Sequence, residues 1–183
     1  KYILLSAHRE ENIDTEKNFM SLFNAINKMA EKYDMPILYS CHPRSRNRLA
    51  ASGFQLDSRV IQHEPLGFHD YNCLQMNAFA VVSDSGTLPE ESSFFTSVGH
   101  PFPAICIRTS TERPEAIDKG DFIIAGIDEK SLLQAVDIAV ELCRDGQHGI
   151  PVPDYVDENV STKVVKIVQS YVGIVNKMVW RKY

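Results

Sequence analysis

The sequence of 183 residues lacks the motifs of several large enzyme classes. It has neither G-x-G-x-x-G after its first strand-like segment nor G-x-x-x-x-G-K-[ST] anywhere, which argues against a nicotinamide dehydrogenase and a P-loop ATPase. The nucleophile elbow G-x-S-x-G is also absent, so the pattern does not favour a hydrolase triad on Ser85.

Excess positive charge, paired cysteines and long apolar runs are missing too. The net charge of −5 and the pI near 5.7 give no electrostatic reason to expect a nucleic-acid partner. The four cysteines form no C-x-x-C and have no zinc-finger spacing with histidine, which predicts reduced thiols, a cytoplasmic location and no metal. No apolar run is long enough to span a bilayer, so no membrane partner is predicted.

Strand-like apolar segments alternate with helical segments about six times along the chain. This alternation predicts an α/β fold with a doubly wound, Rossmann-like parallel sheet. The predicted strands are 2–6, 37–41, 60–62, 79–82, 103–107 and 122–125, and the main predicted helices are 17–33, 44–48, 68–76, 87–99 and 128–143. Residues 7–13 are predicted to form a polar loop.

The pattern changes after Gly146, which divides the chain into a domain at 1–148 and a segment at 149–183. This segment is an extended link followed by a helix over 159–180, whose apolar set is too wide for a solvated surface helix. We expect its first half to pack on the domain and its second half to face a domain outside this sequence. The chain also begins directly on a strand without Met, which predicts a piece of a longer protein.

The stretch 80–94 is predicted to be a strand, a small-residue turn and a helix N-terminus. Such a turn offers free backbone N–H groups that suit a phosphate, whereas the alternative is an ordinary strand-to-helix corner. Thr87 and Glu90 have capping-box spacing. Because two carboxylates beside a phosphate would repel it, Glu90 or Glu91 must face away or bind a neutral hydroxyl group such as ribose.

Polar clusters follow the ends of four predicted strands, where ligands bind in doubly wound sheets. These clusters are His8-Arg9, His42-Pro43, residues 84–86 and residues 108–113. The alternative for the first two clusters is a solvent-facing surface without a ligand. Taken together, the clusters favour a binding site at one edge of the sheet.

In their order, the segments 6–12, 41–43, 83–86 with Glu90-Glu91, and 108–116 resemble the C-terminal half of the non-hydrolysing UDP-N-acetylglucosamine 2-epimerases. The resemblance covers nearly the whole chain. It implies the second domain of a GT-B-like two-domain fold, with the active site in the cleft between two Rossmann-like domains. It also implies a UDP-N-acetylhexosamine substrate, a missing N-terminal domain, a homodimer, and no cofactor or metal.

The resemblance assigns roles by motif position. It implies catalytic roles near the sugar diphosphate for His8 and Arg113. The implied binding residues are Arg9 and Glu11 beside His8, His42 at a second UDP-sugar in some members, Tyr71 beside uracil, Ser85, Gly86 and Thr87 around the diphosphate, Glu91 on the ribose, and Arg108 in the motif of Arg113.

Thr87 stands where the family usually has glycine, and the segment 92–102 is longer than usual. With Thr109-Ser110 and the segment 158–163, these features resemble a subgroup that acts on 6-deoxy sugars in capsule or O-antigen synthesis. That subgroup converts UDP-N-acetyl-L-pneumosamine into UDP-N-acetyl-L-fucosamine.

The reaction that the resemblance implies is anti elimination of UDP to a 2-acetamidoglycal, followed by re-addition with inversion at C2. The carboxylates that move the C2 proton belong to the N-terminal domain of the family, so this chain alone is predicted to be inactive. Three alternatives stay open: a nucleotide-sugar domain of a GT-B glycosyltransferase, a non-catalytic nucleotide-sugar-binding or dimerisation module, and a hydrolysing 2-epimerase.

Overall fold

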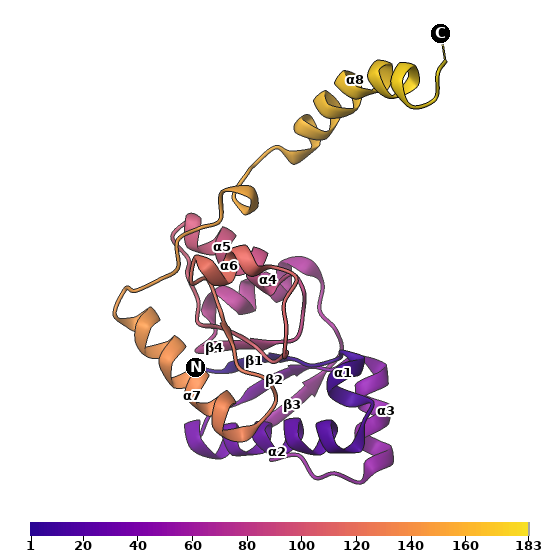
Figure 1. Ribbon diagram of the computed structural model, residues 1–183. Coiled ribbons are helices and arrows are strands. Elements are labelled where there is room, and N and C mark those ends of the chain that lie inside the picture. Colours follow the sequence, from indigo (N-terminus) through magenta and orange to yellow (C-terminus); the bar gives the residue numbers. More distant parts are fainter. Residues whose placement is uncertain (183) are drawn as a thin grey trace.

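The computed structural model describes residues 1–182 and shows one sheet of six parallel strands in the order β3-β2-β1-β4-β5-β6 (Figure 1). The strands are β1 (Ile3–Ser6), β2 (Ile37–Ser40), β3 (Val60–His63), β4 (Ala80–Ser83), β5 (Ala104–Cys106) and β6 (Ile123–Ile124). Every pairing is parallel. The predicted doubly wound, Rossmann-like fold is therefore confirmed.

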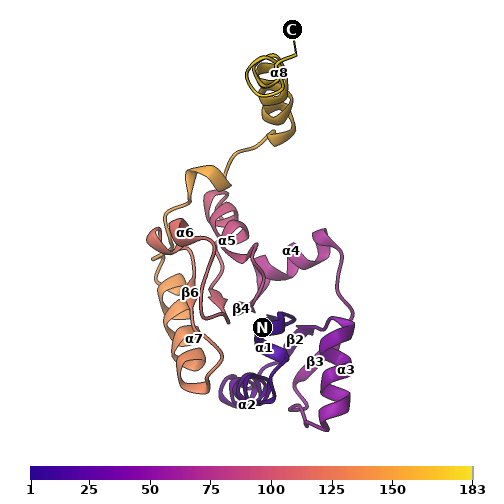
Figure 2. The ribbon, with the colours of Figure 1, turned by 45° about the vertical axis from the view of Figure 1, so that its right-hand side comes forward.

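Helices cover both faces of this sheet (Figures 1 and 2). They are α1 (Glu10–Ile13), α2 (Glu16–Tyr33), α3 (Pro43–Ser52), α4 (Phe68–Asn77), α5 (Leu88–Ser97), α6 (Pro114–Asp118), α7 (Glu129–Arg144), the 3₁₀ turn η1 (Pro153–Tyr155) and α8 (Val160–Met178). The predicted loop 7–13 is wrong in part, because Asn12 and Ile13 are buried and the segment closes into α1.

The core consists of two layers because successive side chains of a strand point to opposite faces. In β1, Ile3 and Leu5 pack in the layer that contains α2 and α7, whereas Leu4 packs with Leu88 of α5 and other residues of the opposite layer. A strand that is buried on both faces must be apolar throughout, which explains the continuous apolar run that predicted it.

The strand order places the topological switch point between β1 and β4. From β1 the chain continues outward to β2 and β3, whereas β4 lies on the other side of β1 and continues to β5 and β6. The register pairs Ser6 with both Ser40 and Ser83, so these three strands end level with one another. The loops that follow them must therefore meet at one edge, where ligands bind in this fold.

The link after α7 is held against the domain before the chain leaves it. The Val152 N–H donates to Ser93 Oγ at 2.7 Å, and Val152 is buried. Gly149 passes so close to Asp121 that an added Cβ would lie 2.7 Å from the Asp121 Cα, so this position requires glycine. The link is therefore part of the domain as far as η1.

Helix α8 projects away from the domain, and it has no buried residue (Figure 1). The expectation that its first half packs on this sheet is not met, because α2, α7, α4 and α5 already cover the two faces. Its exposed apolar side chains include Val164, Ile167, Val168, Tyr171, Val172 and Val175. Tyr183, the last residue of the segment predicted at 149–183, lies outside the described residues.

Candidate functional site

The loops after β1, β4 and β5 are tied together by one buried carboxylate. Asp84 is completely buried, and its Oδ2 accepts hydrogen bonds from the backbone N–H of His8 and of Arg9, both at 2.8 Å. It also accepts one from Asn12 Nδ2 at 3.1 Å, and the same amide donates to the Ile107 carbonyl at 3.0 Å. Asp84 and Asn12 therefore fix the three strand ends relative to one another.

Five of the predicted site residues line one open cavity of about 360 Å³ at this edge: His8, Arg9, His42, Ser85 and Gly86. Glu10 and Arg44 complete its wall. Arg9 Nε donates to the Asp84 carbonyl at 3.3 Å, and a Cβ on Gly86 would lie 3.2 Å from Arg9 Nη2. Because Gly86 has no side chain, Arg9 can approach the turn closely. The cavity thus contains the hydrogen-bond donors that an anion needs.

Within the turn, the structure corrects the prediction of free backbone donors for Ser85 and Thr87. The Ser85 N–H donates to Ser83 Oγ at 3.0 Å, and the Thr87 N–H donates to Ser85 Oγ at 3.3 Å. Short polar side chains compete for nearby backbone groups in this way. The hydroxyl groups of Ser85 and Thr87 are thus the polar atoms beside the cavity, and an incoming phosphate would have to exchange bonds with them to reach the N–H groups.

The predicted capping box is also wrong. Thr87 has helical backbone angles and makes no side-chain cap. Its Oγ1 instead donates to Glu91 Oε1 at 2.7 Å, while Glu91 Oε2 accepts from Gln75 Nε2 at 2.6 Å. Gln75 is buried on α4, so two helices hold this carboxylate in place.

Glu90 and Glu91 have different partners. This agrees with the expectation that two carboxylates beside a bound phosphate would repel it, so that they cannot both face it. Glu90 Oε1 accepts from Arg113 Nε at 2.7 Å and lies 2.6 Å from its Nη2. Arg113 is thus beside Glu90, and it does not line the cavity that contains His8. Burial, followed by the charge of Glu91, raises the pKa of the half-buried Tyr71 to about 12.

A second pocket, of about 530 Å³, lies between α4 and α5 next to Glu91. It is lined by Glu90, Glu91, Asn72, His69 and the apolar side chains of Phe68, Met76, Phe94, Phe95 and Tyr155. Sequence reasoning did not find it, because its aromatic residues come from three segments that only the tertiary structure brings together. The exposed Phe68 gives no separate signal in the sequence.

Arg108 and Glu11, both predicted to bind substrate, are bonded to each other. Arg108 is buried, and its Nε donates to Glu11 Oε1 at 3.0 Å. Its Nη1 and Nη2 donate to the two carboxylate oxygens of Glu112 at 2.7 and 2.8 Å. These contacts hold the segment 108–113 against the loop after β1, and their assignment to substrate binding stays a prediction.

The ion pair of Glu112 makes the stability of the protein depend on pH. The hydrogen bonds from Arg108 lower the pKa of Glu112 from 4.5 to about 2. A carboxylate whose pKa is lowered on folding stabilises the folded state at pH values above its pKa in the unfolded state. This contribution is lost as the pH falls through the pKa in the folded state. We therefore expect Glu112→Gln to be less stable than the parent at neutral pH, with the two converging as the pH falls from about 5 to about 2.

Urea unfolding at several pH values checks this expectation, with Glu16→Gln in the exposed first turn of α2 as the control. A constant difference between Glu112→Gln and the parent across that pH range would contradict it.

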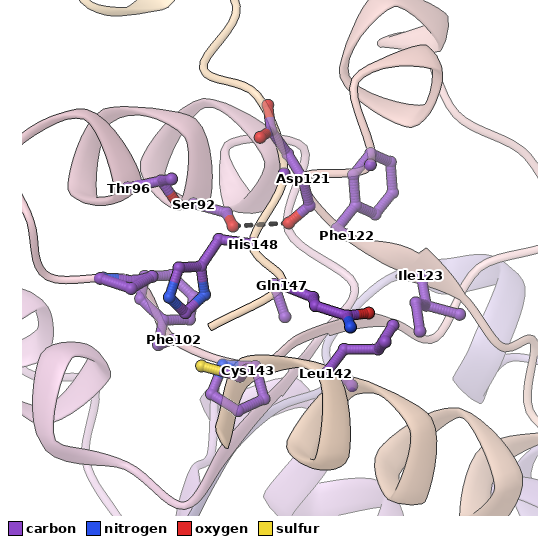
Figure 3. A pocket seen from close by; sticks show the side chains of 16 residues that line it. Ser92, Thr96, Phe102, Asp121, Phe122, Ile123, Leu142, Cys143, Gln147 and His148 are labelled. Atoms are coloured by element: carbon purple, nitrogen blue, oxygen red, sulfur yellow. Dashed lines mark hydrogen bonds between the residues drawn. The ribbon is translucent and has the colours of Figure 1, made fainter. Parts of the chain in front are cut away.

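A third cavity lies away from these residues, between α5 and α7 (Figure 3). Its wall includes Ser92, whose hydroxyl donates to the Asp121 carbonyl at 2.6 Å, and also Cys143 and His148. Burial raises the pKa of Asp121. The cavity has a volume of only about 60 Å³, which is far below the several hundred Å³ of an ordinary ligand pocket. It contains none of the predicted site residues.

Residues 1–182 contain no group of three or more His, Cys, Asp or Glu side chains placed to hold a metal ion. None of the helices in this range combines the length and the apolar content that crossing a membrane requires.

These features define a doubly wound α/β domain whose polar loops meet at the switch point, the class of domain that binds nucleotides at this edge. The family model described as UDP-N-acetylglucosamine 2-epimerase matches residues 1–169. The chain belongs to this family, as its motifs predicted.

Individual relatives agree with this membership. The chain is 31% identical over 148 residues to UDP-N-acetylglucosamine 2-epimerase of Methanocaldococcus jannaschii, covering 79% of this chain and 39% of that protein. It is 34% identical over 136 residues to the Bacillus subtilis enzyme of the same name, covering 73% and 34%. The chain thus spans less than half the length of these relatives.

Solved structures show the same relation. The UDP-N-acetylglucosamine 2-epimerase of Rickettsia bellii superposes with a TM-score of 0.84 and 36% identity, covering 99% of this chain and 47% of that one. The M. jannaschii enzyme in complex with UDP-GlcNAc and UDP gives a TM-score of 0.80 and 27% identity, covering 92% and 45%. These neighbours place the fold among the GT-B-like 2-epimerases.

Proposed function

We propose that this chain is the UDP-binding half of a UDP-N-acetylhexosamine 2-epimerase, an isomerase. The observation that carries the proposal is the cavity at the switch point, where His8, Arg9, His42, Ser85 and Gly86 converge. These residues come from three separate strand ends, and their polar side chains suit a diphosphate. Family membership favours an epimerase over the glycosyltransferase and the non-catalytic module.

A line of hydrogen bonds connects this cavity to the carboxylate proposed for the ribose. Ser85 Oγ lies 2.9 Å from Thr87 Oγ1, which donates to Glu91 Oε1 at 2.7 Å. In a nucleoside diphosphate, the ribose and the diphosphate are separated by a short distance similar to the one between Ser85 and the Glu91 carboxylate. The geometry therefore supports the diphosphate at Ser85-Gly86 and the ribose hydroxyl groups at Glu91, with Tyr71 on the side of the base.

The proposed reaction breaks the C1–O bond of the sugar, and its electrons leave on the UDP oxygen. The C2 proton departs to a base, which leaves a 2-acetamidoglycal, and UDP then adds back at C1 as a proton returns to the other face of C2. His8 and the polar groups of residues 85–87 stabilise the charge that develops on UDP. A well-aimed donor of this kind is commonly worth ~3–4 kcal/mol.

In this proposal Arg113 and the carboxylates of an N-terminal domain complete the cleft, and the chain by itself binds UDP without turning over substrate. The exposed apolar side chains of α8 are proposed to pack against that N-terminal domain, and a homodimer is proposed for the whole protein. His42 is proposed to contact a second UDP-sugar.

The sugar is not decided by family membership. One relative of this chain, 29% identical over 125 residues, is the Pseudomonas aeruginosa UDP-2,3-diacetamido-2,3-dideoxy-D-glucuronate 2-epimerase, so the family includes more than one sugar. A 6-deoxy sugar in capsule or O-antigen synthesis remains our proposal from Thr87 and the segment 92–102. A hydrolysing reaction differs only in the fate of the glycal and the UDP.

Calorimetric titration of this chain with UDP tests the proposal. We expect UDP to bind, and uridine to bind markedly more weakly because it has no diphosphate. We expect His8→Ala to lower the affinity for UDP by about tenfold, which corresponds to the loss of one charge-assisted hydrogen bond. The control is His100→Ala, an exposed histidine far from the cavity in the sequence and absent from its wall. Equal affinity for UDP and uridine would contradict the diphosphate site.

A further inference from the structure

The carboxylate of Asp84 has one oxygen with three partners and one with almost none. Oδ2 accepts from two backbone N–H groups and from Asn12, as described above. Oδ1 is buried and has no hydrogen-bond partner within residues 1–182. The group nearest to it is the His8 ring, whose Nδ1 lies 3.2 Å away. Oδ2 thus explains how the loops are held, whereas Oδ1 is left for His8.

We propose that Asp84 is a positioning residue that holds the proton of His8 on Nδ1, an inference that rests on the proposed function. A carboxylate can only accept hydrogen bonds, so a proton between these two atoms belongs to the imidazole. The His8 side chain is 42% exposed and lines the 360 Å³ cavity, whereas Asp84 is 0% exposed. With Nδ1 turned inward to Asp84, Nε2 is the ring nitrogen that remains for a ligand.

The arrangement gives His8 a defined task when a diphosphate is bound. A second proton on Nε2 makes the ring an imidazolium that lies between two anions, the Asp84 carboxylate and a phosphate oxygen. Its Nε2–H then donates a charge-assisted hydrogen bond, which is roughly twice as strong as a neutral one. Asp84 itself touches no ligand and acts only through the orientation and charge of His8.

Ser6 offers the competing interpretation. Its Oγ lies 3.3 Å from His8 Nδ1 and is able to donate to that nitrogen as well as accept from it. If Ser6 donates, the neutral ring carries its proton on Nε2, and Asp84 has only the structural role of its Oδ2. The two interpretations predict opposite tautomers for the ligand-free protein.

The first measurement is the tautomer of His8, from imidazole ¹⁵N chemical shifts at about pH 8.5, where an ordinary imidazole is neutral. We expect the Nδ1–H form in the parent and in Ser6→Ala. In Asp84→Asn we expect the Nε2–H form, because the amide Oδ1 can keep the backbone N–H bonds while Nδ2 donates to His8 Nδ1. An Nε2–H parent, or an unchanged tautomer in folded Asp84→Asn, would overturn the proposal.

The second measurement is UDP affinity. We expect Asp84→Asn to weaken UDP binding by about tenfold, because the His8 ring of the variant stays neutral and no longer brings a positive charge to the phosphate. In the double variant with His8→Ala, the Asp84→Asn change should have little further effect, since the residue acts through His8.

Asn12→Ala is the matched control, since it removes a bond to Oδ2 and leaves the Oδ1–His8 contact in place. We expect it to lower the melting temperature without changing the His8 tautomer. If Asn12→Ala changed the tautomer and affinity as much as Asp84→Asn, the role of Asp84 would be structural only. Because the tautomer is read without ligand, a parent protein that binds no UDP would refute the proposed function and leave the Asp84–His8 assignment standing.

Discussion

Replacing Glu91 by alanine is expected to weaken UDP binding by at least about a hundredfold, since two charge-assisted hydrogen bonds to the ribose would be lost at ~1.5–3 kcal/mol each. The carboxylate is held in advance by Thr87 and by the buried Gln75, so little of this energy is spent on ordering it. Calorimetric titration of the variant and the parent with UDP measures the effect.

Two further variants separate this role from a general loss of structure. Glu91→Gln keeps the contact with Thr87 and is expected to bind UDP more tightly than Glu91→Ala but more weakly than the parent. Glu141→Ala changes an exposed carboxylate on α7 and is expected to leave affinity unchanged. If Glu91→Ala folds like the parent and binds UDP equally well, the ribose does not lie at this carboxylate.

Replacing Phe23 by alanine is expected to lower the free energy of unfolding by about 3–5 kcal/mol, the usual cost of emptying a buried aromatic site. Phe23 is fully buried, and its ring centroid lies 4.6 Å from Phe19 and 6.0 Å from both Tyr39 and Phe54. Through this side chain, helix α2 contacts both β2 and the segment after α3. Urea unfolding measures the loss, provided that the slope of the transition is unchanged.

Met20 provides the comparison for Phe23, because it lies on the same helix and is 39% exposed. Met20→Ala should change the free energy of unfolding by no more than about 0.5 kcal/mol, as is usual for surface positions. Similar losses for the two variants would show that the rings around Phe23 do not form the centre of this layer.

The local signals in the sequence were strong enough to predict most elements of the domain. All six strands occur where apolar segments predicted them, and α2 and α7 occur where apolar residues recur at helical spacing. The ends differ by a few residues, since the terminal residues of an element depend on hydrogen bonds that its neighbours supply. The four polar clusters were predicted to share one sheet edge. Residues of three of them, the clusters at His8, at His42 and at 84–86, line one cavity, and Asp84 supports its wall.

Pairings between distant charges could not be predicted. Arg108 bonds to Glu11 and Glu112, and Arg113 bonds to Glu90 and does not line the cavity with His8. Except for Arg108 and Glu112, which are four residues apart, these side chains find their partners across the folded chain, and spacing in the sequence carries no information about such distant pairs. The roles of Asp84, Asn12 and Gln75 were missed for the same reason.

The sequence by itself determined the sheet, its direction and the edge at which its polar loops meet, because strand periodicity and alternating order leave few other topologies. Only the tertiary structure decided how those loops are joined: a buried Asp84 between β1 and β4, a Glu91 held by α4, and Glu90 paired with Arg113. It also decided that α8 projects away from this domain and buries no residue. Periodicity is a local property of the chain, whereas the choice of partner depends on what else has packed nearby.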